Sequence, residues 1–140
     1  MNIEVLKNIV QNCELVGEKI VISDNVFNVI DFVKNTYKFD FLKSITAVDN
    51  GDFGIELIYR LFNSADEEEV VISTFVKEEA ESVSSIFDSA VADEKEIYDL
   101  FGINFVGNKE LKRLYMPESW NGHPLRKDYV ENDERLSWND

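Results

Sequence analysis

The spacing of hydrophobic positions changes along the chain between helix-like and strand-like patterns, and this predicts a domain of mixed α and β structure. Residues 2–12 predict a helix because four apolar residues share one face: Ile3, Leu6, Ile9 and Val10. Residues 15–22 predict a short strand pair or a kinked strand. Ser23 or Asp24 is then expected to cap a helix with one apolar side: Val26, Phe27, Ile30 and Val33.

The middle of the chain predicts an antiparallel meander of three strands, over 39–48, 55–62 and 70–76. In the first strand, alternation is expected to turn one set of residues inward: Phe39, Phe41, Ile45 and Ala47. The segment Asp49-Asn50-Gly51-Asp52 predicts a tight turn, because Asn-Gly tolerates positive φ. A second turn is expected over the polar residues 63–69.

After the meander, Ser82 is expected to cap a helix that reaches Val91. Continued without a break, this helix would place Glu94 on its apolar stripe, and burying a lone carboxylate costs several kcal/mol. Either a cation pairs with Glu94 or the helix breaks near Asp93, and we expect the break. A second, two-turn helix would then end at Gly102.

Beyond Gly102, apart from a possible turn near Lys109 to Leu114, the pattern becomes irregular, and Pro117, Gly122 and Pro124 discourage regular structure. We therefore expect one α+β domain, an antiparallel sheet with helices packed on it, over residues 1–106. Residues 107–140 are expected to form an extended docking tail of the same domain. The apolar residues of this tail argue that it is ordered by lying on something: Trp120, Leu125 and Tyr129.

The composition fits one domain with a real core, since 44% of the 140 residues are hydrophobic and 12% aromatic. The single cysteine, Cys13, excludes an internal disulfide and any cluster or zinc site built from thiolates of this chain alone, and it is expected to be buried. There is no apolar run long enough for a membrane span and no signal-peptide pattern at the N-terminus. We expect a cytoplasmic protein.

The net charge of −14 is unevenly distributed, with 8 Lys/Arg against 21 Asp/Glu in residues 1–108 and 5 against 3 in residues 109–128. Such an acidic body argues against nucleic-acid binding. The acidity either serves solubility or directs the basic island, residues 109–127, to an acidic partner. A rival interpretation is a free-standing acidic regulator that binds a basic partner through residues 64–81.

The candidate catalytic residues are few. His123 is the only histidine, and a small hydrolase using it is a minor alternative because no nucleophile-elbow motif accompanies it. Glu94, Glu96 and Asp99 form an acidic group at helical spacing, for which capping and solvation of a short helix is favoured over acid–base chemistry. Arg126 and Lys127, flanked by Trp120 and Tyr129, are typical of an interface anchor.

Two segments carry a resemblance to a known family. One is Glu94-Lys95-Glu96-Ile97-Tyr98-Asp99-Leu100-Phe101-Gly102-Ile103, followed by Phe105, Lys112-Arg113 and Pro117. The other is Trp120, Gly122 and Pro124-Leu125-Arg126-Lys127-Asp128-Tyr129. Together with Ser44-Ile45-Thr46-Ala47-Val48-Asp49 and Ile58-Tyr59-Arg60-Leu61, they resemble the 30 kDa subunit of respiratory complex I, the NADH-quinone oxidoreductase. This family includes the related subunit of energy-converting nickel-iron hydrogenases.

The chain departs from the family pattern at four places. Lys95 stands where Arg is usual, Asn108-Lys109 replace His-Pro, Ala92 replaces a common Trp and Asp88 a Pro. Lysine lacks the bidentate fork of arginine, so that contact is expected to be weaker or rearranged. The departures and the short length favour a divergent, hydrogenase-type branch.

The resemblance implies a non-catalytic assembly subunit in the peripheral arm of a membrane-bound oxidoreductase, on the cytoplasmic side. Its partners would be the large subunit with the quinone or nickel-iron site and a cluster-bearing small subunit. Iron-sulfur clusters and nickel-iron or flavin are expected in those partners and no cofactor in this chain. The implied partner-binding residues are Glu94, Glu96, Asp99, Lys112, Arg113, Trp120, Gly122, Pro124, Leu125, Arg126, Lys127, Asp128 and Tyr129.

Overall fold

The computed structural model describes residues 13–108, which contain two sheets and two α-helices. The larger sheet has the strand order β1-β2-β5-β4-β3, and the smaller one pairs β6 with β7. The elements of the larger sheet are β1 (Cys13–Val16), β2 (Lys19–Ile22), β3 (Phe41–Asp49), β4 (Ile55–Asn63) and β5 (Glu68–Val76). The remaining elements are α2 (Val26–Tyr37), the short 3-10 turn Gly51–Phe53, β6 (Glu79–Glu81), α3 (Ala90–Phe101) and β7 (Asn104–Val106).

The α+β class is confirmed, and so is the antiparallel meander β3-β4-β5. The strand pair predicted over residues 15–22, before α2, is the antiparallel hairpin β1-β2. Cys13 is buried as expected. The sheet as a whole is mixed rather than antiparallel, because β2 pairs with β5 in parallel, with Ile20 beside Ile72. The helix α2 separates β2 from β3, so β2 does not pair with the strand that follows it in the chain. Instead β2 lies beside β5, at the opposite edge of the meander from β3.

Of the set predicted to alternate inward over residues 39–48, Phe39 and Ile45 are buried, but the prediction is wrong at Phe41. Phe41 is 55% exposed, whereas its neighbour Leu42 is buried, and Ile45 is buried three positions further on. A bulge between Leu42 and Ser44 shifts the register against β4 and moves the inward set by one residue. The sequence does not reveal such an inserted residue, because the bulge depends on the partner strand.

The turn predicted at Asp49-Asn50-Gly51-Asp52 is present as the 3-10 turn Gly51–Phe53 between β3 and β4. It needs two glycines with positive φ, Gly51 at 65° and Gly54 at 92°. The predicted second turn is shorter than expected, because β4 and β5 extend to Asn63 and Glu68.

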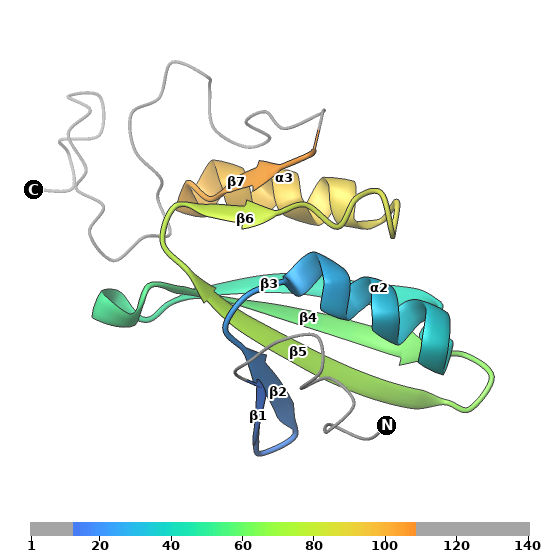
Figure 1. Cartoon of the computed structure of the whole chain (residues 1–140). Coiled ribbons are helices and arrows are strands. Elements are labelled where there is room, and N and C mark those ends of the chain that lie inside the picture. Colours follow the sequence, from blue (N-terminus) through green and yellow to red (C-terminus); the bar gives the residue numbers. More distant parts are fainter. Residues whose placement is uncertain (1–12, 109–140) are drawn as a thin grey trace, which may run out of the picture.

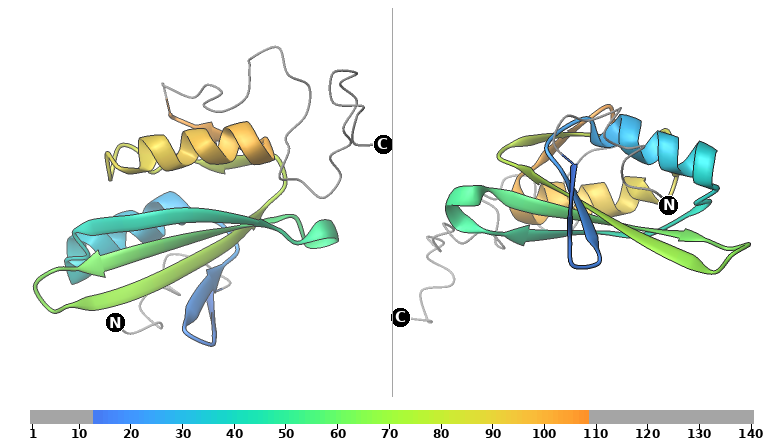
Figure 2. Two further views of the ribbon diagram at one scale, coloured as in Figure 1. Left: turned by 180° about the vertical axis from the view of Figure 1, so that it is seen from behind. Right: turned by 60° about the horizontal axis from the view of Figure 1, so that its bottom comes forward.

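Both helices lie over the same face of the larger sheet (Figure 1 and Figure 2). The core forms between them and the inward residues of β4: Ile55, Leu57, Tyr59 and Leu61. Val26, Ile30 and Val33 of α2 are buried as predicted, while Phe27 is half-buried. The predicted cap at Ser23 or Asp24 is wrong: Asn25 precedes the helix in a left-handed conformation and makes no side-chain capping bond.

The segment after the meander differs most from the prediction. Residues 82–89 form turns rather than a helix, and α3 runs without a break through Asp93 and Glu94. Asp93 caps nothing: its Oδ2 accepts a hydrogen bond from the Ile45 backbone N–H of β3 at 3.1 Å. The predicted end at Gly102 is confirmed, with a left-handed φ of 79° and its N–H donating to the Tyr98 carbonyl at 3.0 Å.

The expectation of irregular structure directly after Gly102 is wrong: residues 104–106 form β7, which pairs with β6 far earlier in the chain. The predicted helix over 2–12 lies outside the described residues, and so do the tail residues beyond 108. The domain boundary at 106/107 stays a prediction.

Candidate functional site

The parallel pairing of β6 with β7 brings two loops together. In a parallel pair both strands end on the same side, so the residues that follow them become neighbours. Ala80 pairs with Phe105, and the backbone N–H of Ser82 donates to the Val106 carbonyl at 2.9 Å. Residues 82–85 after β6 therefore lie beside residues 107–108 after β7, next to α3 (Figure 1).

Glu94 of α3 is fully buried at this junction and accepts three hydrogen bonds. Oε1 accepts from the Ser82 hydroxyl at 2.7 Å and from the Asn108 side-chain amide at 2.9 Å. Oε2 accepts from the Val83 backbone N–H at 2.9 Å. We call Glu94, Ser82, Val83 and Asn108 the carboxylate junction. All three donors are neutral, so neither the predicted cation nor the predicted helix break is needed to satisfy this carboxylate.

Burial and hydrogen bonding oppose each other at Glu94. Burial raises the pKa of Glu94, the three donors lower it, and the negative charge of Asp93 adds to the increase; burial is the larger effect. Burial also raises the pKa of Asp93, against the hydrogen bond from Ile45.

Tyr59 extends from β4 toward the same region. Its side chain is fully buried, and its hydroxyl has no hydrogen-bond partner among the described residues. Burial, with the charges of Glu94 and Glu81, raises the pKa of Tyr59 well above its ordinary value. The phenol therefore remains neutral, and a neutral hydroxyl is the only form that this apolar environment tolerates.

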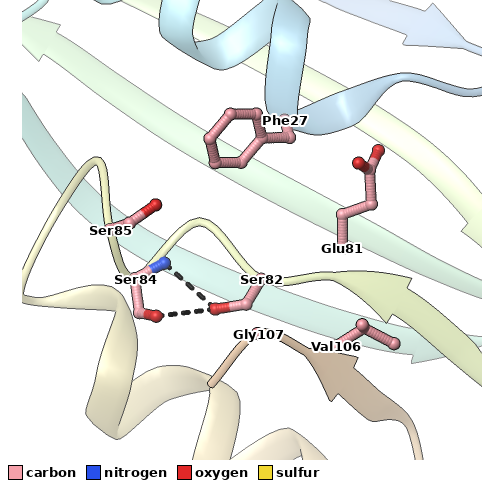
Figure 3. Close-up of a pocket in the computed structure, with 7 residues that line it drawn as sticks. All are labelled: Phe27, Glu81, Ser82, Ser84, Ser85, Val106 and Gly107. Atoms are coloured by element: carbon pink, nitrogen blue, oxygen red, sulfur yellow. Dashed lines mark hydrogen bonds between the residues drawn. The ribbon is translucent and has the colours of Figure 1, made fainter. Parts of the chain in front are cut away.

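A pocket of about 300 Å³ opens on the other side of Ser82 (Figure 3). It is lined by Phe27 from the start of α2, Glu81 from the end of β6, three serines, and residues from the end of β7: Ser82, Ser84, Ser85, Val106 and Gly107. Ser82 belongs both to the pocket wall and to the carboxylate junction. The pocket and the junction thus share one side chain.

The predicted partner-binding residues fall into two groups. Glu94 and Asp99 are fully buried, whereas Glu96 is exposed. Glu94 and Glu96 are two positions apart on α3, which turns them to nearly opposite sides, so the helix does not bring them together as an acid–base pair. The interpretation of Glu94 as a solvated or capping residue is wrong. Partner binding by Glu94, Glu96 and Asp99 stays a prediction; of the three, only Glu96 has an exposed side chain in the described part of the chain.

The other predicted partner-binding residues lie outside the described part of the chain, as does His123. They are Lys112, Arg113, Trp120, Gly122, Pro124, Leu125, Arg126, Lys127, Asp128 and Tyr129. Sequence reasoning did not find the pocket or the partners of Glu94. The available signal was Glu94 itself on an apolar stripe, together with the serine-rich segment after β6.

The described range offers neither a metal site nor a membrane span. Residues 13–108 contain no group of three or more His, Cys, Asp or Glu side chains placed to hold a metal ion. No helix within this range is long and apolar enough to cross a membrane.

The fold and the junction define an acidic α+β domain with a mixed five-stranded sheet and a small parallel sheet beside its second helix. The family described as the respiratory-chain NADH dehydrogenase 30 kDa subunit matches residues 20–135. The chain belongs to this family, which confirms the resemblance seen in the sequence.

Relatives of three kinds illustrate this membership. An NADH-quinone oxidoreductase subunit of Phocaeicola vulgatus, designated C/D, is 41% identical over 97 residues, covering 66% of this chain and 19% of the relative. An NAD(P)H-quinone oxidoreductase subunit of Lemna minor chloroplasts, designated J, is 37% identical, covering 81% and 77%. An NADH-quinone oxidoreductase subunit of Citrifermentans bemidjiense, designated C, is 32% identical, covering 76% and 69%. This chain spans about a fifth of the length of the Phocaeicola vulgatus relative.

Proposed function

We propose that this chain is a non-catalytic assembly subunit in the peripheral arm of a complex-I-like oxidoreductase. It docks on the large subunit of that complex through residues 112–129, with Arg126 and Lys127 supplying charge-assisted hydrogen bonds and Trp120 and Tyr129 burying their rings. The quinone site or nickel-iron site, the iron-sulfur clusters and any flavin belong to partner subunits. The chain is held on the cytoplasmic face of the membrane through those partners.

The observation that carries this proposal is the length of the Phocaeicola vulgatus relative. There the matching sequence makes up 19% of one polypeptide whose name joins the letters C and D. A sequence that is fused to another subunit in one organism is expected to contact the separate counterpart of that subunit in another. The family match also extends to residue 135 and so includes the proposed docking segment.

The carboxylate junction is a structural observation that supports the same proposal. Asn108 immediately precedes the basic island and is tied to Glu94 in the middle of α3. The buried Glu94 carboxylate restrains Asn108, four positions before the docking segment begins, and restraint before binding lowers the entropy lost on binding. Glu94 would thus act as a positioning residue for docking.

The test is co-expression of the tagged full-length chain with the large-subunit gene of the same organism. Deleting residues 117–129 should abolish co-purification of the large subunit, while circular dichroism shows an unchanged fold. The matched control is deletion of 130–140, which removes a similar length of chain beyond the docking segment and should leave co-purification intact. Undiminished capture of the large subunit by the 117–129 deletion would overturn the proposal.

A further inference from the structure

The pocket beside Ser82 is lined by residues outside the proposed docking segment, and its wall has a defined arrangement of hydroxyl hydrogens. Ser82 has one hydroxyl hydrogen, which it donates to Glu94 at 2.7 Å. The contact of 2.7 Å between the Ser82 and Ser84 hydroxyl oxygens therefore has Ser84 as its donor. The Ser84 backbone N–H also donates to Ser82, at 3.1 Å.

These hydrogen bonds give the pocket wall a polarity. The hydrogens of both hydroxyl groups are directed along a chain that ends at the buried carboxylate of Glu94, which leaves the lone pairs of Ser84 as acceptors. Figure 3 shows the two hydroxyls directed toward each other along one wall. A ligand that donates hydrogen bonds fits the Ser84 part of this wall, whereas a ligand that only accepts them would depend on the Ser85 hydroxyl, which also lines the pocket.

Two further groups define the ligand more closely. The Glu81 side chain is exposed at the rim, and no described cation forms an ion pair with it. The ring of Phe27 lies across the hollow from the serines (Figure 3). A carboxylate and an aromatic ring on one small hollow favour a cation that can pair with the first and stack on the second.

We propose that this pocket binds an arginine side chain of the partner polypeptide on which the chain docks. The guanidinium group would pair with Glu81, stack on Phe27 and donate to the Ser84 hydroxyl, and about 300 Å³ is sufficient for it. The acidic surroundings add long-range attraction, because residues 1–108 hold 21 Asp/Glu against 8 Lys/Arg. The identity of the polypeptide rests on the proposed function, whereas the preference for arginine rests on the pocket alone.

Arginine is favoured over two other ligands. A phosphate or carboxylate would face the lone pairs of Ser84 and the charge of Glu81, which both repel it. A lysine ammonium would pair with Glu81, but it lacks the planar face that stacks on Phe27 and the fork that spans two acceptors.

The first experiment titrates the isotopically labelled full-length chain with acetyl-arginine amide and follows backbone amide signals by NMR. Saturable shifts are expected at Ser84, Ser85 and Gly107. Acetyl-citrulline amide has the same shape without the charge and should bind at least about fivefold more weakly, as should acetyl-lysine amide. Equal binding of the three probes, or shifts scattered over the acidic surface, would overturn the proposal.

Three variants locate the binding. Glu81→Gln should weaken binding of the arginine probe about fivefold or more. Glu79→Gln is the matched control, because Glu79 is an exposed residue of the same strand that does not line the pocket, and it should change binding less than twofold. Equal losses in both variants would reduce the effect to general acidity and overturn the proposal. Phe27→Leu should weaken binding as well; if it perturbs the fold, the Glu81 and Glu79 pair still decides.

A fourth variant tests whether the arginine in the pocket comes from the partner or from this chain itself. If only an Arg113→Gln/Arg126→Gln chain binds the probe, the pocket is occupied by this chain's own arginines and the proposed occupant is wrong.

In the co-expressed complex, Glu81→Gln should lower recovery of the large subunit after a salt wash about fivefold, with Glu79→Gln unchanged. The two proposals can fail separately. If the 117–129 deletion still captures the large subunit while the arginine probe still binds, the tail is not the docking segment but the pocket proposal stands.

Discussion

The Asn108 side-chain amide donates to Glu94 Oε1 at 2.9 Å and so joins the residue after β7 to the middle of α3, fourteen positions earlier in the chain. Together with the bonds from Ser82 and Val83, this contact makes one buried carboxylate the meeting point of the segment after β6, the helix and the segment after β7. The stability of the small parallel sheet should therefore depend on Glu94 more than on any exposed charge of α3.

Replacing Glu94 tests this dependence. Glu94→Leu leaves three buried donors without an acceptor and should lower the free energy of unfolding by about 3 to 5 kcal/mol. Glu94→Gln keeps one oxygen but turns an NH₂ group toward the Val83 N–H, and should cost about 1 to 3 kcal/mol. Urea unfolding followed by circular dichroism measures both. Glu96→Gln, an exposed change on the same helix, should leave the midpoint unchanged, and an equal midpoint for Glu94→Gln would contradict the prediction.

The raised pKa of Glu94 predicts how the difference in free energy of unfolding between wild type and Glu94→Gln depends on pH. A carboxyl whose pKa is higher in the folded than in the unfolded state binds more protons when folded, so its contribution to stability falls as pH rises. Between the ordinary value of 4.5 and the raised value, proton uptake at Glu94 adds stability to wild type on acidification, and this contribution is absent from Glu94→Gln. The stability gap between them should be larger at about pH 5.5 than at about pH 7.5, because proton uptake at Glu94 is absent from the variant.

The same urea unfolding series measured at the two pH values provides the test. Three other carboxyl groups with shifted pKa values, Asp40, Glu56 and Glu69, are present in both proteins and cancel in the difference. Asp93 interacts with Glu94, so the difference reports the titration of this pair. A gap that stays constant, or grows as pH rises, would show that Glu94 is not the group responsible.

Tyr59 offers a substitution that should not destabilise the domain. Its hydroxyl is buried and has no hydrogen-bond partner among residues 13–108. Removing an unsatisfied polar group while keeping the ring should leave the free energy of unfolding unchanged or raise it by up to about 2 kcal/mol. Thermal and urea unfolding of Tyr59→Phe measure this, with Tyr37→Phe, a half-buried tyrosine of α2, for comparison. A loss above about 1 kcal/mol would mean that the hydroxyl is hydrogen-bonded in solution.

Two glycines in the β3-β4 turn form a matched pair. A Cβ atom at Gly54, where φ is 92°, would lie 2.6 Å from the Val76 carbonyl oxygen of β5, whereas at Gly51, where φ is 65°, it would meet nothing within 4 Å. Gly54→Ala should therefore cost more than about 2 kcal/mol, and Gly51→Ala only about 1 kcal/mol for its left-handed backbone. Urea midpoints measure both, and equal costs would exclude the clash with β5 as the cause.

Local patterns predicted those parts of the fold whose cause is local. Val26, Ile30 and Val33 lie on the buried side of α2 because helical spacing determines their direction, and Gly102 ends α3 because its backbone tolerates positive φ. The bulge after Leu42 and the parallel neighbour of β5 were not predictable, since each depends on a strand far away in sequence.

The error at Glu94 has the same origin. Its position on an apolar stripe correctly predicted a buried carboxylate if the helix continued. The side chains that satisfy it come from positions 82, 83 and 108, and neither their donors nor their direction can be recognised before β6 and β7 pair. The pocket was missed because Phe27 and Glu81 come from elements that the sequence does not place side by side.

The parallel pairing of β6 and β7 also has a mechanical consequence. Two parallel strands pulled by the end of one of them slide along each other, so all their backbone hydrogen bonds share the load. Tension applied beyond Asn108 would reach this three-residue ladder and the Glu94 carboxylate before any strand of the larger sheet. The small sheet is therefore the part of the described fold that such tension loads first, and its resistance is limited by the three residues of the ladder.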